Sequence, residues 1–403
     1  MKPAVKWLWM QQTFGIGTRH AHEVLTNCGT PDEVLSLCGD RLHNDKTLTD
    51  EDKLAIASPD FSKAEAAIEE IESMGWTVIT PDDDIYPERL RTIHSMPMVL
   101  YAKGDLSLLT ETYAIAMVGM RECDEYGARC GRKIATEIAA LGGVVVSGLA
   151  RGIDSVCHEA ALDVGGKTIA FLAVGPDGNY PMQTRDLRKK IEQKGLVVTE
   201  FPLRSQVRGH SFHIRNRLIS GISLGTVVVE AARHSGSLIT AGHAIMQDRD
   251  LYAVCGNIFS LKFEGNHKLL SEGAAAAFSG VDIMRGYEAV YGEELSPICS
   301  EKQMNAKANP VRFEMPPEPE RKLKKKTKTE EKPVKKTPKR LSTDALNSEQ
   351  EKVYLACEEE ISFDELCQKS EISAGALLSI LTQLEIFGYI ETIPGRRYRP
   401  VMK

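Results

Sequence analysis

Between residues 76 and 286 the chain alternates short runs of apolar, often β-branched residues with longer amphipathic stretches. Nearly continuous apolar runs separated by helix-length segments are typical of parallel strands that helices cover on both faces. The pattern therefore predicts an α/β domain over residues 73–286, built on a parallel sheet. Ligands of such sheets bind at the carboxyl ends of the strands, so we expect a site in the loops there. The predicted strands are residues 77–80, 114–118, 144–147, 168–174, 196–200, 226–230 and 251–254.

The flanking segments have different patterns. Residues 1–72 have apolar positions at helical spacing, which predicts a small helical domain. One turn in it, residues 14–17, has the order of helix-hairpin-helix modules, whose backbone amides meet a DNA phosphate, although a plain turn explains it equally well. Residues 287–345 are rich in proline and lysine and predict a disordered linker. Residues 346–403 predict three helices and a β-hairpin, the pattern of a winged helix.

Composition restricts the class of protein. The 403 residues carry a net charge of -6, and 42% of them are apolar, which is ordinary for a water-soluble protein. We find no signal peptide and no apolar run long enough to span a bilayer, so we expect a cytoplasmic protein without a membrane partner. The nine cysteines form no C-x-x-C pair, and the histidines lack metal-ligand spacing, so we predict no metal site.

Positive charge is concentrated in one part of this acidic chain. Residues 201–229 contain no Asp or Glu, but they include Arg204, Arg208, Arg215 and Arg217. A local excess of this kind is typical of a phosphate-binding surface. In the same window, Phe212 is a candidate to stack on a base while guanidinium groups meet phosphates, as in sites for single strands. The alternative for Phe212 is an ordinary core position.

Three loops at predicted strand ends carry glycine, namely residues 119–121, 147–154 and 235–237. Glycine allows the backbone to approach a phosphate, and the following helix adds the positive end of its dipole. The alternative is that these glycines only turn the chain. None of the loops has the G-x-G-x-x-G or P-loop order, so we predict neither a dinucleotide cofactor nor ATP hydrolysis. At the end of the strand over 226–230, Glu230 is a candidate to orient a ribose.

With these motifs in view, residues 76–286 resemble the DNA-processing protein A family (DprA, also called Smf). The helical N-terminal segment and the winged helix fit the longer members. The resemblance implies an extended Rossmann-like domain and a non-enzymatic, cofactor-free protein of natural transformation. Such a protein binds and protects incoming single-stranded DNA, forms a homodimer through the Rossmann domain and helps load the RecA recombinase. The motifs that carry the resemblance are residues 84–87, 118–121, 147–154, 165–170, 180–181, 212–217, 229–231, 235–241, 265–266 and 273–274.

The resemblance also implies roles for individual residues. Arg121 and Arg151 are expected to hold phosphates or sugars, and Phe212 to stack on a base. The residues at 215–217 are expected to organise the loop beneath. The full set expected to bind DNA is Gly119, Arg121, Ser147, Gly148, Arg151, Phe212, Arg215, Asn216, Arg217, Ser235, Gly236 and Ser237.

Two alternatives remain open at this point. Arg215 and Arg217 are interpreted equally well as structural residues that pin the loop through carboxylates such as Asp154 or Glu230. The chain also departs from the family pattern in the segment 258–264 and at Met120, His213 and Cys255. These departures leave the details of the pocket undecided.

The competing class is an enzyme. Residues 227–241 are distantly similar to the nucleotide phosphoribohydrolases of the lysine-decarboxylase-like type, whose glycine-rich loop binds a phosphate. Those enzymes place a Gly-Gly-x-Gly-Thr segment before a glutamate-bearing helix, whereas this chain has a different sequence at residues 231–237. A phosphoribohydrolase-like enzyme is therefore the second hypothesis.

Overall fold

The computed structural model describes residues 2–207, 209–292, 295–308, 343, 346–357, 360–370, 372, 374–393 and 397–401. They belong to two compact units, Met1–Pro310 and Val311–Lys403, and each unit is described by itself. Within the described ranges, no helix combines the length and apolar character needed to cross a membrane. Arg208 and most of the predicted linker lie outside the described residues.

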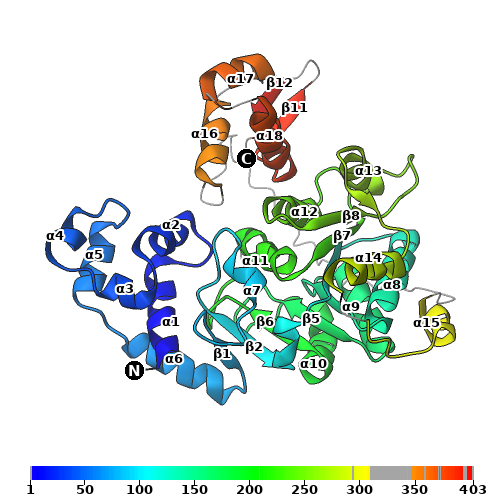
Figure 1. The fold of residues 1–403 in the computed structure, drawn as a ribbon, viewed down its shortest axis with the longest axis horizontal. Helices are drawn as coiled ribbons and strands as arrows, with labels where there is room; N and C mark the ends of the chain where they lie inside the picture. Colours follow the sequence, from blue (N-terminus) through cyan, green and yellow to red (C-terminus); the bar gives the residue numbers. More distant parts are fainter. Residues whose placement is uncertain are drawn as a thin grey trace, which may run out of the picture. The chain divides into compact units, whose positions relative to one another are not determined.

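A sheet forms the centre of the first unit (Figure 1). It has nine strands in the order β1-β2-β6-β5-β4-β3-β7-β8-β9. Neighbours from β6 to β9 run parallel, whereas β2 pairs antiparallel with both β1 and β6. The predicted α/β fold with a largely parallel sheet is confirmed. The strands are β1 (Thr77–Ile79), β2 (Leu100–Gly104), β3 (Ala114–Gly119), β4 (Val144–Ser147), β5 (Lys167–Phe171), β6 (Leu196–Thr199), β7 (Gly225–Glu230), β8 (Asp250–Ala253) and β9 (Ala275–Ala276).

Two of these strands, β2 and β9, are absent from the sequence prediction. Strand β2 contains a lysine and a glycine at its exposed end, and β9 consists of two alanines, so neither has the β-branched run that marks the others. Both lie in the outer part of the sheet, where pairing with a neighbour, rather than side-chain pattern, defines a strand.

Helices connect and cover the strands. Helix α11 lies within the arginine-containing window 201–229, and it packs against α12 and α7. The helices are α7 (Glu88–Arg91), α8 (Glu125–Ala140), α9 (Ile153–Asp163), α10 (Arg185–Lys194), α11 (Gly209–Ile222), α12 (Ser237–Met246), α13 (Glu264–Ser271), α14 (Gly280–Tyr291) and α15 (Glu301–Ala308). Short 3-10 helices are η1 (Leu106–Thr110), η2 (Met182–Thr184) and η3 (Leu261–Phe263).

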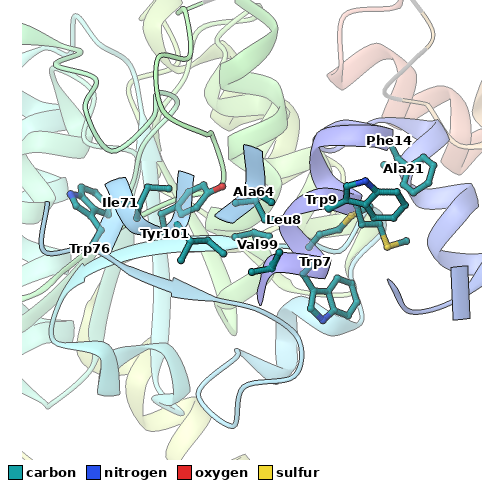
Figure 2. Packing of buried hydrophobic residues seen from close by; sticks show 14 of the residues in the cluster. Trp7, Leu8, Trp9, Phe14, Ala21, Ala64, Ile71, Trp76, Val99 and Tyr101 are labelled. Carbon is teal, nitrogen blue, oxygen red and sulfur yellow. The ribbon is translucent and has the colours of Figure 1, made fainter. Parts of the chain in front are cut away.

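The N-terminal segment is helical, as predicted, and its apolar side chains are continuous with those of the sheet. Figure 2 shows Trp9 and Leu8 of this segment in one buried cluster with Val99 and Tyr101, which lie in and next to β2. The proposed domain boundary at residue 72 therefore falls inside a shared core. The helices are α1 (Pro3–Phe14), α2 (Arg19–Cys28), α3 (Pro31–Leu35), α4 (Gly39–Asn44), α5 (Asp50–Ala57) and α6 (Ser62–Ser73).

Part of the range 287–345, which the sequence predicts as a linker, is helical in the structure. Helix α14 continues to Tyr291, and α15 packs against α8 with Met304 buried. In addition, Ile298 N donates a 2.8 Å hydrogen bond to the carbonyl of Ala140. Tyr287 and Met304 of this stretch are therefore buried, although proline and lysine dominate the composition farther along.

The second unit is a winged helix, as predicted. Asn347 caps its first helix, because its side chain accepts a 2.8 Å hydrogen bond from Gln350 N. Leu346, Tyr354, Leu366 and Leu381 are among its fully or almost fully buried residues. Residues 394–396 of the expected hairpin turn lie outside the described residues. The elements are α16 (Ser348–Ala356), α17 (Phe363–Ser370), α18 (Ala374–Ile386), β10 (Ile361–Ser362), β11 (Ile390–Ile393) and β12 (Arg397–Pro400), with sheet order β10-β12-β11.

Candidate nucleic-acid interface

A cavity of 670 Å³ lies at the carboxyl ends of strands β3 and β7. Its walls come from the loops after these strands, the first turns of α9, α11 and α12, and the segment where η3 leads into α13. Of the residues expected to bind DNA, the cavity is lined by Gly119, Arg121, Phe212, Arg215, Asn216, Ser235, Gly236 and Ser237. Ser147, Gly148, Arg151 and Arg217 do not line it.

Close packing brings the loop after β3 to the start of α9. A Cβ atom at Gly119 would lie 2.6 Å from Cγ1 of Ile153. Gly152 has a φ of +86°, and a Cβ atom there would lie 2.3 Å from the carbonyl oxygen of Met120. The same carbonyl accepts a hydrogen bond from Ile153 N at 3.2 Å. These glycines therefore permit the close approach that holds Met120 and its neighbour Arg121 at the cavity.

The rim of the cavity combines an aromatic ring with exposed cations. The guanidinium carbon of Arg121 lies 4.8 Å from the ring centroid of Phe212, within cation–π range. Arg121 and Arg233 are exposed, whereas Phe212 is half-buried. The ring of Tyr180, from the loop after β5, lies 5.7 Å from that of Phe212. An aromatic ring and exposed positive charge thus occur together at the rim of the cavity.

Beneath the rim, hydrogen bonds to Asp154 of α9 and from Arg215 of α11 hold the loop after β4 in place. The Asp154 carboxylate accepts hydrogen bonds from Gly148 N at 3.1 Å and Ala150 N at 3.3 Å. Arg215 donates to the carbonyl of Gly148 at 2.6 Å and also to the carbonyl of Phe171. Two amides that the sequence offers to a phosphate therefore bind a carboxylate of the protein instead.

Burial perturbs the charged groups of this floor. It raises the pKa of Asp154, against the opposing effects of Arg215 and the two amides. It also lowers the pKa of Arg215 to about 10, against the attraction of Asp154. Arg215 remains charged at neutral pH because this value is still well above 7. Asp154 and Arg215 thus influence each other electrostatically in the floor of the cavity.

Arg217 lies away from the cavity in a buried ion pair. Its Nη2 donates to both carboxylate oxygens of Glu200, at 2.7 and 2.6 Å, and both side chains are almost fully buried. The structural role considered for Arg217 is thus present, but its partner is Glu200 and not Asp154 or Glu230. The sequence does place Glu200 at the end of a predicted strand. It does not show that Arg217 meets this carboxylate, because only the fold brings the two residues together.

Glu230 also faces the interior and does not line the cavity. It accepts hydrogen bonds from Asp124 N at 3.1 and 3.2 Å, at the start of α8. Burial, together with the nearby Asp124, raises the pKa of Glu230 to about 7. Lys262 approaches it to 3.9 Å. Glu230, which was expected to orient a ribose, therefore caps helix α8. The positive end of a helix dipole stabilises a carboxylate at this position.

Four further expected residues, Ser147, Arg151, Ser235 and Ser237, have partners inside the protein. Ser147 is buried and donates a 2.6 Å hydrogen bond to the carbonyl of Met117. Arg151 forms a 3.0 Å ion pair with Glu122, which lines the cavity. The hydroxyls of Ser235 and Ser237 lie 2.8 Å apart at the start of α12.

Several residues of the cavity were not predicted from the sequence. Arg233, His213 and His234 line it, and Arg233 is the most informative because it adds an exposed positive charge. Its position in the loop after β7, two residues before Ser235, could have identified it. The departures at Met120 and His213 fall in the lining, and Leu261 and Glu264 line it from the segment 258–264. Cys255 is not part of it, and its carbonyl accepts a hydrogen bond from Tyr126 at 2.7 Å.

Comparison with known proteins agrees with this architecture of a largely parallel α/β domain followed by a winged helix. The family model of DNA recombination-mediator protein A matches residues 77–288, and the DprA winged helix domain matches residues 337–396. The chain is 40% identical to the DNA processing protein DprA of Streptococcus pneumoniae over 208 residues, 51% of this chain and 72% of the relative. It is 31% identical to the protein Smf of Synechocystis over 353 residues, 82% of each. The chain belongs to the DprA/Smf family.

Two solved structures complete the comparison. The X-ray structure of DprA from Streptococcus pneumoniae aligns with a TM-score of 0.61 and 31% identity, covering 71% of this chain and 98% of that one. A structure of DNA processing protein A from Helicobacter pylori, described as having a unique single-stranded DNA binding mode, aligns with a TM-score of 0.49 and 26% identity. It covers 53% of this chain and 96% of that one.

Proposed function

We propose that this protein binds single-stranded DNA at the cavity described above and acts in natural transformation, without catalysing a reaction. The observation that carries the proposal is the Arg121–Phe212 pair at the rim of a 670 Å³ cavity. An aromatic ring beside cations is the combination that binds single strands, because every base offers a π-face and every nucleotide a phosphate. Of the residues expected to bind DNA, Arg121 and Phe212 at the rim would make these contacts with phosphate and base.

The shape of the site favours a single strand over a duplex. The cavity is a concave space between loops, whereas proteins that bind a duplex insert a protruding helix or strand into a groove. Bases in a duplex are stacked on one another and do not offer a face to Phe212. A single strand can direct one base into the cavity while its phosphates meet Arg121 and Arg233.

Catalysis is not part of the proposal, because the buried carboxylates near the cavity already have partners. Asp154 accepts two backbone hydrogen bonds and lies beside Arg215, and Glu230 caps helix α8. Asp154 lines the cavity, but its carboxylate is engaged by these amides, and Glu230 does not line the cavity. The phosphoribohydrolase alternative predicts release of free base from nucleoside monophosphates, which an incubation with the purified protein would detect.

For partners, we propose a homodimer through the Rossmann-like domain and transfer of the DNA to RecA. Support for the dimer comes from large apolar side chains that follow the carboxyl ends of neighbouring strands β8 and β9. Phe259 is 87% exposed, and Ile258 and Phe278 are also highly exposed. Exposed large apolar side chains of this kind are typical of protein interfaces. Light scattering should give a dimer mass for the parent and a lower mass for Phe259→Asp.

The experiment that tests DNA binding is a salt titration with oligonucleotides of equal length, single- and double-stranded. We expect clear preference for the single strand. Each phosphate contact should contribute roughly -0.7 to the slope of log affinity against log salt. Equal affinity for the duplex, or a slope near zero, would overturn the proposal. Addition of RecA to the preformed complex, followed by recombinase filament formation on the same strand, tests the transfer.

A further inference from the structure

We infer that Tyr180 is a second base-stacking position, just outside the cavity, and that a bound single strand leaves the cavity across Phe212 and then Tyr180. This inference rests on the proposed function and extends the site to a residue with no assigned role. Tyr180 lies in the loop between β5 and η2, far from Phe212 in the sequence. The two rings nevertheless lie 5.7 Å apart, with an angle of 56° between their planes.

Exposure distinguishes the two rings. Tyr180 is 38% exposed although its ring contacts that of Phe212. Phe212 is half-buried, and the guanidinium group of Arg121 lies over its face. Tyr180 therefore presents open aromatic surface at the edge of the cavity. An exposed aromatic ring at a site that already combines a ring with cations is suited to a nucleobase.

The backbone that carries Tyr180 is fixed in place on both sides. Arg188 of α10 donates to the carbonyls of Gly178 and Pro176, the latter at 2.9 Å. On the other side, the hydroxyl of Thr184 donates to the carbonyl of Leu149 at 3.0 Å. A ring presented from an anchored loop loses little conformational freedom when a base stacks on it, so more of the stacking energy is available for binding.

The spacing of the rings determines how a strand can use them. A base needs about 3.5 Å to a ring on each of its faces, so a base between two rings requires roughly 7 Å. The observed 5.7 Å is too short for such a sandwich. Two successive bases must therefore stack on separate faces, one at Phe212 and one at Tyr180. Tyr180 then serves nucleotides beyond the one in the cavity.

The residues that follow Tyr180 in the sequence indicate the direction in which the bound DNA continues. Helix η2 follows at once, and α10 begins with the exposed Arg185. Lys189, one turn farther along and also exposed, lies on the same face of the helix. These cations are suited to the phosphates of the nucleotides that follow the stacked pair.

The test compares Tyr180→Ala with Tyr180→Phe, which retains the ring and removes only the hydroxyl. Met182→Ala is the matched control, because Met182 lies two residues away and is exposed. Fluorescence anisotropy with oligothymidylates of about 4 and about 16 nucleotides spans the usual site sizes of single-strand binding surfaces. For the longer probe we expect Tyr180→Ala to weaken binding about five-fold or more, and the other two variants to bind like the parent.

The outcomes separate this inference from the proposed function. Tight binding of the longer probe by Tyr180→Ala, equal to that of the parent, would overturn the role of Tyr180 and leave the proposed function intact. A loss in Tyr180→Phe as large as in Tyr180→Ala would also overturn it, because stacking does not need the hydroxyl. Failure of the parent itself to bind the longer probe would overturn the proposed function, and this inference with it.

Photocrosslinking gives a readout that does not depend on a substitution. Oligothymidylate with single 5-iodouracil positions crosslinks to aromatic side chains that stack on the modified base. We expect crosslinked peptides that contain Tyr180 for one iodouracil position and Phe212 for an adjacent one. Crosslinks to Phe212 alone, at every position along the strand, would overturn the inference.

Discussion

The floor and the rim of the cavity use the same residue type in opposite ways. Arg215 and Arg217, in the floor and behind it, are buried and bonded to carbonyls or a carboxylate of the protein. Arg121 and Arg233, at the rim, are exposed to solvent. Burying a guanidinium group is costly unless it is paired and hydrogen-bonded, so the floor arginines stabilise the fold. We expect substitutions in the floor to affect stability and substitutions at the rim to affect binding.

The largest expected effect is on stability. Arg217→Met leaves the buried carboxylate of Glu200 without its partner, and removal of one member of a buried pair costs about 3–5 kcal/mol. Chemical denaturation should show this decrease in the free energy of unfolding. The double variant Glu200→Gln with Arg217→Met removes both charges and should recover part of it. A single variant as stable as the parent would remove the distinction between floor and rim.

The next effect concerns the aromatic part of the rim. Phe212→Ala should weaken single-strand binding by about 1–3 kcal/mol and leave the salt slope nearly unchanged, because a base loses its stacking partner while the arginines still meet the phosphates. Binding titrations at several salt concentrations measure both quantities. Thermal unfolding like that of the parent is the required control. Unchanged affinity in a folded variant would place the DNA on another face of the domain.

The cationic part of the rim should respond differently. Arg121→Ala should reduce the steepness of the salt slope by roughly 0.7 for each phosphate that the arginine neutralises, and Arg121→Lys should restore it, since the charge is retained. Arg41→Ala, an exposed arginine on α4, is the matched control and should have no effect. A slope that changes equally in Arg121→Ala and Arg41→Ala would show that net charge alone governs binding.

The smallest expected effect is that of removing the second unit. A chain that ends after residue 308 keeps α14 and α15 and should lose less than about 1 kcal/mol of single-strand affinity, because the rim remains intact. A chain that ends after residue 286 cuts through α14 and removes Tyr287, whose hydroxyl donates to Asp250 at 2.8 Å. The shorter chain should be measurably less stable. Loss of all binding in the longer, folded chain would move the DNA site to the winged helix.

The pattern of the sequence was sufficient for the parallel part of the fold. Apolar, β-branched runs mark the central strands because both faces of those strands are buried, and capping residues such as Asn347 mark helix starts because they satisfy orphan amides. Motif similarity then identified the family, and eight of the twelve residues that it implied for DNA binding line the cavity. The outer strands β2 and β9 were missed, since their positions depend on partners distant in the sequence.

The tertiary structure alone decided which polar groups remain available to a ligand. The sequence shows Asp154, Glu200 and the arginines of α11, but it does not show which of them meet. Folding brings Asp154 to the amides of its own loop and Glu200 to Arg217, so both carboxylates have partners inside the protein. Arg121, Arg233 and Tyr180 stay exposed at the rim. Pairing in the interior is set by three-dimensional proximity, and no local sequence pattern encodes that proximity.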